Sequence, residues 1–341
     1  MTKRILPMIA ALACTTACAL TLVACGGGGD DTNPNLLTEA EWKEQFNALL
    51  ATPDYSFSQS HYDATQSQYV KDTALYVDTA ARGYSYSYSE NDGSSTNELF
   101  IKDGIYYESY SYMDSEIGTF GTRTRTAAEF AEIEDEEFLS GWNVFVEQAL
   151  VLCRDKFSSF TTDAGTTYEA ENVAATINNP FTEEDMDVTV GRITMIFQEK
   201  ELANITLYDI EGDEMETKMM WEYCPGANMQ AIIDGVYLPQ IKGAKYELTA
   251  VNDNSSAPDV TENEGKYIKW KDDGTLEGDI SISGLSIADG TMTCGDNGIV
   301  ITIGDYTLTG YCMREDITTT MVLTLPIAES NEITYTFTLI L

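Results

Sequence analysis

Two spacings of apolar residues alternate along the chain and predict its helices and strands. The first apolar positions of the folded part recur at intervals of three and four residues, at Trp42, Phe46, Leu49 and Leu50. This spacing places them on one face of a helix. Thr38, with Glu41 three residues later, has the capping-box pattern of a helix start. We therefore expect an amphipathic helix that ends before Pro53.

Between Tyr55 and Phe120 apolar and polar residues alternate instead, which is typical of β-strands. The pattern is clearest in a tyrosine stripe, a set of rings separated by polar residues: Tyr84, Tyr86, Tyr88, Tyr106, Tyr110 and Tyr112. Because successive side chains of a strand point to opposite faces, the rings of each strand are expected on one face. Asp103-Gly104, between Leu99–Ile101 and Ile105–Tyr107, predicts a β-hairpin.

A second helix is predicted after Thr126, which forms another capping box with Glu129. Its apolar face contains Phe138, Trp142, Phe145, Val146, Ala149, Leu150 and Cys153. We expect this face to lie on the sheet. Further strands are predicted at Thr166–Asn172, Val188–Phe197, Leu202–Tyr208 and Glu216–Tyr223. The last three of these strands are expected to form an antiparallel meander.

After Gly235 the sequence has no helical pattern and many tight turns. Short strand-like segments recur at Tyr246–Val251, Tyr267–Trp270, Leu276–Ile282, Thr291–Thr293, Ile299–Ile303, Tyr306–Tyr311, Thr318–Leu325 and Ile333–Ile340. They predict a small up-and-down β-barrel. The expected fold class is therefore an α+β N-terminal domain, residues 36–230, followed by an all-β barrel domain, residues 235–341. A protease-sensitive boundary is expected between Gly226 and Gly243.

The first residues have the pattern of an export signal. Lys3 and Arg4 precede a mostly apolar run from Ile5 to Ala24. A run of this length is close to that of a membrane-spanning helix, so an uncut transmembrane anchor is one alternative.

The end of this run, Leu22-Val23-Ala24-Cys25, resembles the lipobox of bacterial lipoproteins. The resemblance implies a signal peptide at residues 1–24, export by the general secretory route and a diacylglyceryl anchor on Cys25. Residues 25–35 are rich in glycine and are expected to be a flexible tether. The chain would then be held by its lipid anchor on the extracytoplasmic face of the cell membrane.

The composition limits the classes of partner. The 341-residue chain has 56 acidic and 19 basic residues and a formal net charge of −37. Such an acidic surface repels nucleic acids and anionic lipid headgroups, which excludes nucleic-acid-binding proteins. The acidity also keeps an exported protein soluble, which is the simpler interpretation. Composition does not indicate an oligomeric state.

Four of the seven cysteines belong to the predicted domains, at Cys153, Cys224, Cys294 and Cys312. An even number outside the cytoplasm is compatible with two disulfides. If bridges form, we expect pairing within domains, Cys153 with Cys224 and Cys294 with Cys312. Buried free thiols are the alternative. The spacing matches no zinc-site pattern, because no Cys-x-x-Cys is present and His61 is the only histidine.

No arrangement of residues in the sequence predicts catalysis. His61, expected in a loop, offers little for acid–base chemistry on its own. No Gly-x-Ser-x-Gly, P-loop or His-Glu-x-x-His motif is present. The acidic clusters Glu183–Asp187 and Asp213–Glu216 have oxygen ligands that suit calcium but lack the order of an EF-hand, and solvated turns also explain them. We expect a protein that is not an enzyme and has no cofactor and no metal.

Two wider resemblances concern the predicted domains. The N-terminal helix, the tyrosine-rich strands and the meander Val188–Tyr223 are similar to the extracytoplasmic lipoproteins related to the carrier LolA and the mycobacterial lipoglycan-binding lipoproteins. This resemblance implies a curved half-barrel sheet with helices packed on it, whose concave apolar face holds acyl chains. Gly243–Leu248, Trp270–Thr275 and Ile299–Ile301 resemble the lipocalin-like modules of bacterial lipoproteins, although the Gly-x-Trp of lipocalins is absent.

The candidate ligand site is an apolar groove between the second helix, with Trp142, and the sheet. Its floor is predicted to consist of Met195, Phe197, Leu207 and Met220, with tyrosines of the stripe at its mouth. Cross-strand packing beneath the second helix, or a half-exposed outer face, is the alternative role of the tyrosine stripe. Two hypotheses follow: a lipoprotein that binds or carries a hydrophobic or amphiphilic ligand such as a lipid, and a cell-surface interaction or structural lipoprotein with no small-molecule ligand.

Overall fold

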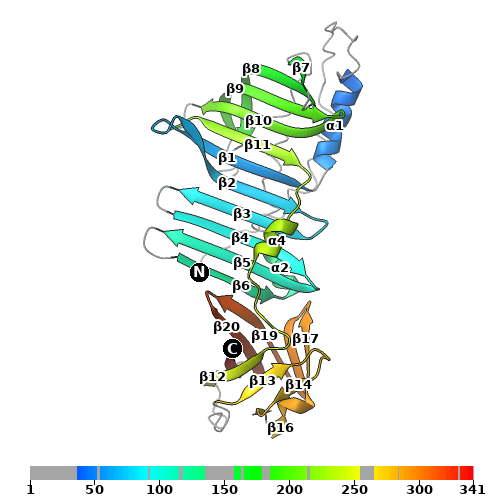
Figure 1. Cartoon of the computed structure of the whole chain (residues 1–341), viewed down its shortest axis with the longest axis vertical. Helices are drawn as coiled ribbons and strands as arrows, with labels where there is room; N and C mark the ends of the chain where they lie inside the picture. The colour runs from blue at the N-terminus through cyan, green and yellow to red at the C-terminus, as the bar shows by residue number, and fades with distance from the viewer. Residues whose placement is uncertain are drawn as a thin grey trace.

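A computed structural model describes residues 37–51, 54–90, 93–114, 118–134, 157–162, 165–178, 185–212, 216–253, 265–282, 284–328 and 331–340. Most of these residues belong to strands of one antiparallel sheet, whose strands are stacked along the long axis of the molecule (Figure 1). The predicted signal peptide, Cys25 and the tether lie outside the described residues. The predicted apolar helix face from Phe138 to Cys153, which includes Trp142, also lies outside them.

The N-terminal part of the sheet contains eleven of the strands. They are β1 (Tyr55–Asp63), β2 (Gln68–Asp78), β3 (Gly83–Glu90), β4 (Gly93–Lys102), β5 (Ile105–Asp114), β6 (Gly118–Arg125), β7 (Ser158–Thr162), β8 (Gly165–Asn178), β9 (Asp185–Gln198), β10 (Glu201–Gly212) and β11 (Met219–Pro225). In space they follow the order β7-β8-β9-β10-β11-β1-β2-β3-β4-β5-β6. The predicted hairpin β4–β5 and the predicted meander β9–β10–β11 are both confirmed.

The C-terminal part continues the same sheet. Its strands are β12 (Lys245–Asp253), β13 (Tyr267–Trp270), β14 (Leu276–Gly278), β17 (Thr291–Gly295), β18 (Gly298–Ile303), β19 (Tyr306–Glu315), β20 (Thr318–Ala328) and β21 (Asn331–Ile340). They follow the order β14-β13-β12-β21-β20-β19-β18-β17. The predicted strand Leu276–Ile282 is divided, because β15 (Ser281–Ile282) pairs separately with β16 (Leu285–Ser286).

The two parts meet where β19 pairs with β6. Met313, Arg314 and Glu315 lie opposite Arg123, Thr122 and Gly121, respectively. We call this ladder the β6–β19 junction. This ladder joins two segments that are far apart in the sequence into one sheet. Neither β6 nor β19 is therefore a free edge strand along the paired residues.

The predicted fold class is therefore wrong. The described residues are mostly β and form one open antiparallel sheet, and they do not form an α+β domain followed by a closed barrel. Between β14 and β17 the described residues show one isolated bridge, Thr275 with Thr291, where a closed barrel requires a ladder. The α-helices of the described residues are short: α1 (Glu39–Ala51), α2 (Ala127–Ile133) and α4 (Gln230–Gly235). A 3₁₀ turn, η4, spans Ile287–Asp289.

Both predicted capping boxes are confirmed. The Thr38 amide donates to Glu41 Oε2 at 2.7 Å, and the Glu41 amide donates to Thr38 Oγ1 at 3.3 Å. Thr126 and Glu129 make the same reciprocal bonds at the start of α2, at 2.9 and 3.1 Å. These bonds satisfy amides that have no partner within the first helical turn.

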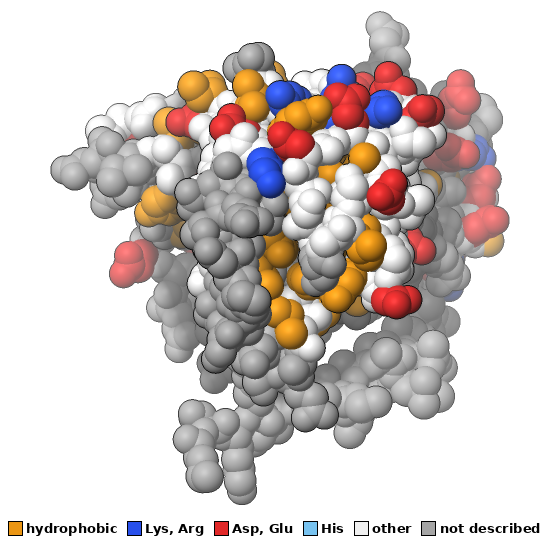
Figure 2. All heavy atoms as spheres, turned by 90° about the horizontal axis from the view of Figure 1, so that it is seen from below, with side chains coloured by type: hydrophobic (Ala, Val, Ile, Leu, Met, Phe, Trp, Pro, Cys, Tyr) orange, Lys and Arg blue, Asp and Glu red, His pale blue; other side chains and the backbone are white. Residues whose placement is uncertain are grey.

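The sheet has two faces of different character in its N-terminal part. The inner face, which carries Leu75, Tyr84 and Leu99, belongs to a core with Trp42 of α1 and Phe130 of α2. The outer face carries the residues that alternate with these. A separate core is formed by the C-terminal strands, including the buried Ile301, Leu308 and Phe337. Figure 2 views the end of the molecule near β16, where apolar side chains are gathered among acidic and basic ones.

The segment after β11 crosses the outer face on its way to β12 (Figure 1). Met229 and Ile233 are buried there against Phe100 and Tyr107. The Met229 amide also donates to Asp78 Oδ2 at 3.2 Å. The proposed protease-sensitive boundary therefore contains a segment that is fixed to the sheet by an apolar cluster.

Met229→Ala removes an apolar side chain that is fully buried at the start of α4. We expect the free energy of unfolding to fall by about 2–5 kcal/mol, and cleavage between residues 226 and 243 to become faster. Chemical denaturation and limited proteolysis measure the two effects. The exposed neighbour Gln230→Ala is the control and should cleave at the wild-type rate. Equal cleavage rates of the Met229→Ala variant and wild type would contradict this account of the segment.

Candidate ligand-binding site

The tyrosine stripe lies on the inner face, where much of it packs. Tyr84 is buried, its hydroxyl donates to Glu134, and its ring meets Phe130 edge to face. Tyr106 contacts the same Phe130 ring at a centroid distance of 5.2 Å. Tyr86 is partly buried on this core. The rings of β3 and the start of β5 thus form the surface on which α2 rests.

Two tyrosines of the stripe also make polar contacts through their hydroxyl groups, and Tyr112 is 51% exposed. The Tyr110 hydroxyl donates to Glu315 Oε1 at 2.8 Å, and the Tyr106 hydroxyl donates to Asp296 Oδ1 at 3.0 Å. Tyr88 lies opposite Thr73 of β2. Both acceptors belong to the C-terminal part, so the stripe helps to join the two parts of the sheet.

The structure brings three of the four predicted groove-floor residues together. Met195, Phe197 and Leu207 are buried in the inner core. The Trp42 ring of α1 lies 5.9 Å from the Phe197 ring, measured between centroids. Met220 is placed on the opposite face, because its neighbour Trp221 lies opposite Leu207 in the core. Successive strand residues alternate between faces, so a one-residue difference removes Met220 from the group.

The predicted Cys294–Cys312 disulfide is absent. Cys224, Cys294 and Cys312 are free thiols, and Cys153 lies outside the described residues. β18 separates the strands that carry Cys294 and Cys312. Strands two positions apart are about 9.5 Å apart, beyond the roughly 4.4–6.8 Å that a disulfide allows between Cα atoms. Burial raises the pKa of Cys294 to about 11 and that of Cys312 to about 12.

His61 lies in strand β1, and its predicted position in a loop is wrong. Its Nδ1 atom is 2.5 Å from Asp72 Oδ1 on β2. Within the described ranges, no group of three or more His, Cys, Asp or Glu side chains is placed to hold a metal ion. Parts of the acidic clusters at residues 183–187 and 213–216 lie outside those ranges.

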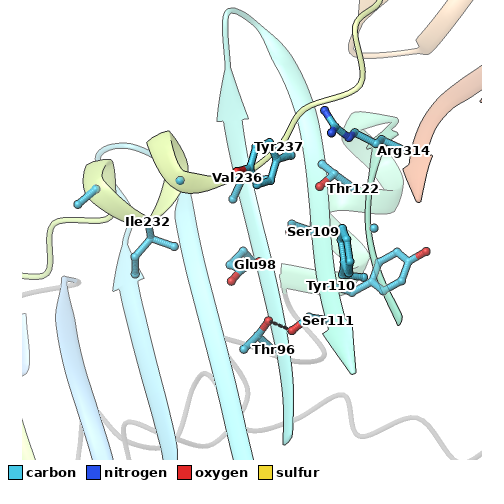
Figure 3. A pocket seen from close by; sticks show the side chains of 14 residues that line it. Thr96, Glu98, Ser109, Tyr110, Ser111, Thr122, Ile232, Val236, Tyr237 and Arg314 are labelled. Atoms are coloured by element: carbon cyan, nitrogen blue, oxygen red, sulfur yellow. Dashed lines mark hydrogen bonds between the residues drawn. The ribbon is translucent and has the colours of Figure 1, made fainter. Parts of the chain in front are cut away.

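The outer face forms one side of a cavity of about 380 Å³ beside α4 (Figure 3). We call it the outer-face cavity. Its polar lining consists of Thr96 and Glu98 of β4, Ser109, Tyr110 and Ser111 of β5, Thr122 of β6 and Arg314 of β19. Its apolar lining includes Phe120, Ile232, Val236 and Tyr237. The cavity therefore takes residues from both parts of the sheet and from the segment that crosses it.

Strand alternation explains the hydroxyl groups. Glu98 lies opposite Ser109, and Thr96 lies opposite Ser111, so these polar residues share a face. Thr96 Oγ1 and Ser111 Oγ are hydrogen-bonded at 2.7 Å (Figure 3). The apolar cluster beneath α4 covers the end of the strands near Phe100, and the serine- and threonine-rich end remains as the wall of the cavity.

Glu98 is the acidic group of this wall. It is half-buried, and burial raises its pKa above the ordinary value of 4.5, while hydrogen bonds with Ser109 and Thr96 act in the opposite direction. A carboxylate has about four acceptor positions, so Glu98 has capacity for a ligand hydroxyl besides its bonds with Ser109 and Thr96.

Aromatic rings lie at the rim of the cavity. Tyr237 is 69% exposed and Phe120 is 48% exposed, which is unusual for such large apolar groups. The Arg314 guanidinium carbon lies 5.1 Å from the centre of the Tyr237 ring, within the range of a cation–π contact. The rim thus offers flat apolar surface next to the polar wall.

A second hollow, of about 550 Å³, lies between β8, β9 and β10. Its lining includes Asp187 and Glu211 and no aromatic ring. It is larger, but it lacks the combination of hydroxyl groups and exposed rings that a small polar ligand requires for orientation.

Of the ligand-binding residues predicted from the sequence, Tyr110 lines the outer-face cavity, but the other residues of its lining were not predicted. The signal of the cavity was present as Thr96-x-Glu98 and Ser109-x-Ser111, polar residues spaced by two on neighbouring strands. This pattern is equally typical of an outer face in water. The cavity forms because the segment with α4 and Tyr237 crosses this polar face of the sheet. No periodicity in residues 226–244 predicts the path of that segment.

The raised pKa of Glu98 predicts a pH dependence of stability. A carboxyl group whose pKa is higher in the folded protein binds its proton more tightly there, so the free energy of unfolding falls as pH rises above 4.5. Glu98→Gln removes this proton equilibrium. We expect the melting temperature of wild type to fall relative to that of the variant as the pH rises above 4.5. A constant difference between the two melting temperatures as the pH rises would show that the pKa of Glu98 is not raised by folding.

The chain matches no protein-family model, and no characterised protein sequence is significantly similar to it. The resemblances to the LolA-related lipoproteins and to lipocalin-like modules therefore stay predictions from the sequence.

Proposed function

We propose that this chain is an exported, lipid-anchored and non-catalytic protein that binds a ligand on the outside of a membrane. The lipobox ending at Cys25 and the glycine-rich tether after it support the anchor. Among the described residues, no helix has the length and apolarity to cross a bilayer.

The observation that carries the binding function is the outer-face cavity. It combines hydrogen-bonding side chains on three adjacent strands with exposed aromatic rings. This is the composition of a small-molecule site, in which a few polar groups orient a ligand that apolar groups hold. Among the described residues the lining contains one carboxyl group, Glu98, whereas glycoside hydrolysis by a pair of acids requires two. The described lining therefore lacks the pair of acids of a glycoside hydrolase.

The position of this cavity changes the type of ligand that we favour. The predicted floor of an acyl-chain groove is buried in the inner core, with Trp42 packed on Phe197. The outer-face cavity is lined by hydroxyl groups, so it suits a polar molecule or the polar part of an amphiphile.

An interaction protein with no small-molecule ligand is the second candidate. The exposed Tyr112, Met113 and Ile317 favour it, because exposed apolar side chains are common at protein-binding surfaces.

Replacing Cys25 tests the anchor. In cells that produce the Cys25→Ala variant, we expect loss of labelling by a palmitate analogue and release of the protein from the membrane fraction, because no acyl chain remains to insert. Cys224→Ala, which changes a thiol of the folded part, is the control and should be labelled and fractionate as wild type does. Labelling that persists in Cys25→Ala would contradict the lipid anchor.

A further inference from the structure

We propose that the outer-face cavity binds a neutral sugar ring, held between the hydroxyl-lined wall of β4–β6 and the exposed Tyr237 ring. This inference deepens the proposed function, since it names the class of ligand for the same cavity. Four properties of the site lead to it: the type of its polar groups, its volume, its rim and its charge.

The polar groups match a ring that carries several hydroxyls. Thr96, Ser109, Ser111 and Thr122 each present a hydroxyl oxygen. Thr96 and Ser109 are hydrogen-bonded to Glu98, and Ser111 to Thr96, so these three hydroxyls offer their remaining lone pairs as acceptors. Sugar hydroxyls are donors that suit such acceptors. Glu98 adds an acceptor that accepts more strongly than a neutral group when it is ionised. Because the residues lie in register on adjacent strands, the wall presents them as a regular array and not as a single contact.

The size and the rim select a compact ring. A volume of about 380 Å³ is near the lower end of the roughly 300–1,000 Å³ typical of ligand sites, so a long polymer does not fit inside. Arg314 lies over the Tyr237 ring, yet Tyr237 remains 69% exposed. The carbon-bound hydrogens of a sugar ring form a flat apolar face that packs against an aromatic ring. The wall then meets the hydroxyls at the edge of the same sugar.

The charge of the lining favours a neutral ligand. Among the lining residues that the structure describes, Glu98 is the only acidic one and Arg314 the only basic one. The chain as a whole has a net charge of −37, which repels anions. A cationic ligand would pair with Glu98, but Arg314 lies in the same lining and opposes it.

The cavity lies on the β6–β19 junction, because Thr122 and Arg314 are opposite each other in that ladder. A sugar that contacts both residues, together with Tyr237, adds interactions between the two parts of the sheet. Ligand binding is therefore expected to raise the melting temperature of the whole chain, since a ligand that binds only the folded state stabilises it.

The test uses the full-length, detergent-extracted protein and a panel of probes. The probes are the methyl glycosides of glucose, galactose, mannose and N-acetylglucosamine, with choline as the cationic and acetate as the anionic comparison. Calorimetric titration measures affinity. We expect at least one methyl glycoside to bind, and Glu98→Gln and Tyr237→Ala each to weaken it about tenfold or more. Tyr306→Ala, which truncates a partly exposed tyrosine at the other end of β19, is the matched control and should bind as wild type does.

The outcomes separate this inference from the proposed function. Binding of a methyl glycoside that depends on Glu98 and Tyr237 supports the sugar site. Glu98-dependent binding of choline overturns the ligand class but leaves a binding function in place. Binding of no probe overturns the sugar site, and with it the small-molecule role of the cavity, whereas the anchor is tested separately at Cys25. Wild-type affinity in Tyr237→Ala, an exposed position where folding is not at risk, also overturns the proposal.

Discussion

A strand at the edge of a β-sheet leaves a row of amide and carbonyl groups that need partners, and β6 satisfies this need with β19. Bonds outside the ladder reinforce the pairing. The Cys312 amide donates to Thr124 Oγ1 at 3.0 Å, and the Ala127 amide, the first of α2, donates to the Asp296 carbonyl at 2.7 Å. The Asp316 amide donates to the Phe120 carbonyl at 3.3 Å. Two chain segments with separate apolar cores thus share one hydrogen-bonded sheet.

The candidate site depends on this junction. The ladder places Arg314 beside Thr122, and Arg314 in turn lies over Tyr237. The apolar cluster under α4 fixes the segment before Tyr237 to the outer face. The cavity is therefore a consequence of two non-local contacts, one between strands and one between a helix and a sheet face. Its wall of serine, threonine and Glu98 is the ordinary polar half of an alternating strand.

Local features of the fold were predictable from local sequence. Both capping boxes, the hairpin around Asp103-Gly104 and the meander β9–β11 follow from spacings within a few residues, and the structure confirms them. The sequence did not predict which distant strand completes the edge of β6, because alternation specifies a face and not a partner. The prediction of a closed barrel for the last strands was wrong for the same reason, because alternation does not specify which strands pair.

The candidate site was less predictable than the fold. The regular spacing of the tyrosine stripe suggested a ligand site. In the structure Tyr84 and Tyr106 instead pack against Phe130 of α2, which agrees with the alternative role in packing. Hydrophobicity alone predicts that Met220 belongs to the groove floor with Met195. The strand register places Met220 on the other face of the sheet. Glu98 and Tyr237 carry no motif, and their roles arise from the path of α4, whose six residues are too few for a helical period to be seen.

The most direct test of one continuous sheet is residue-resolved hydrogen exchange of the native protein. The amides of Ala127, Cys312 and Asp316 all donate across the β6–β19 junction. If the junction is part of the folded sheet, these three amides exchange slowly, as do amides within the β4–β5 ladder. Exchange at the rates of exposed turns, with the β4–β5 amides still protected, would show that the two parts are separate and that the outer-face cavity is not formed.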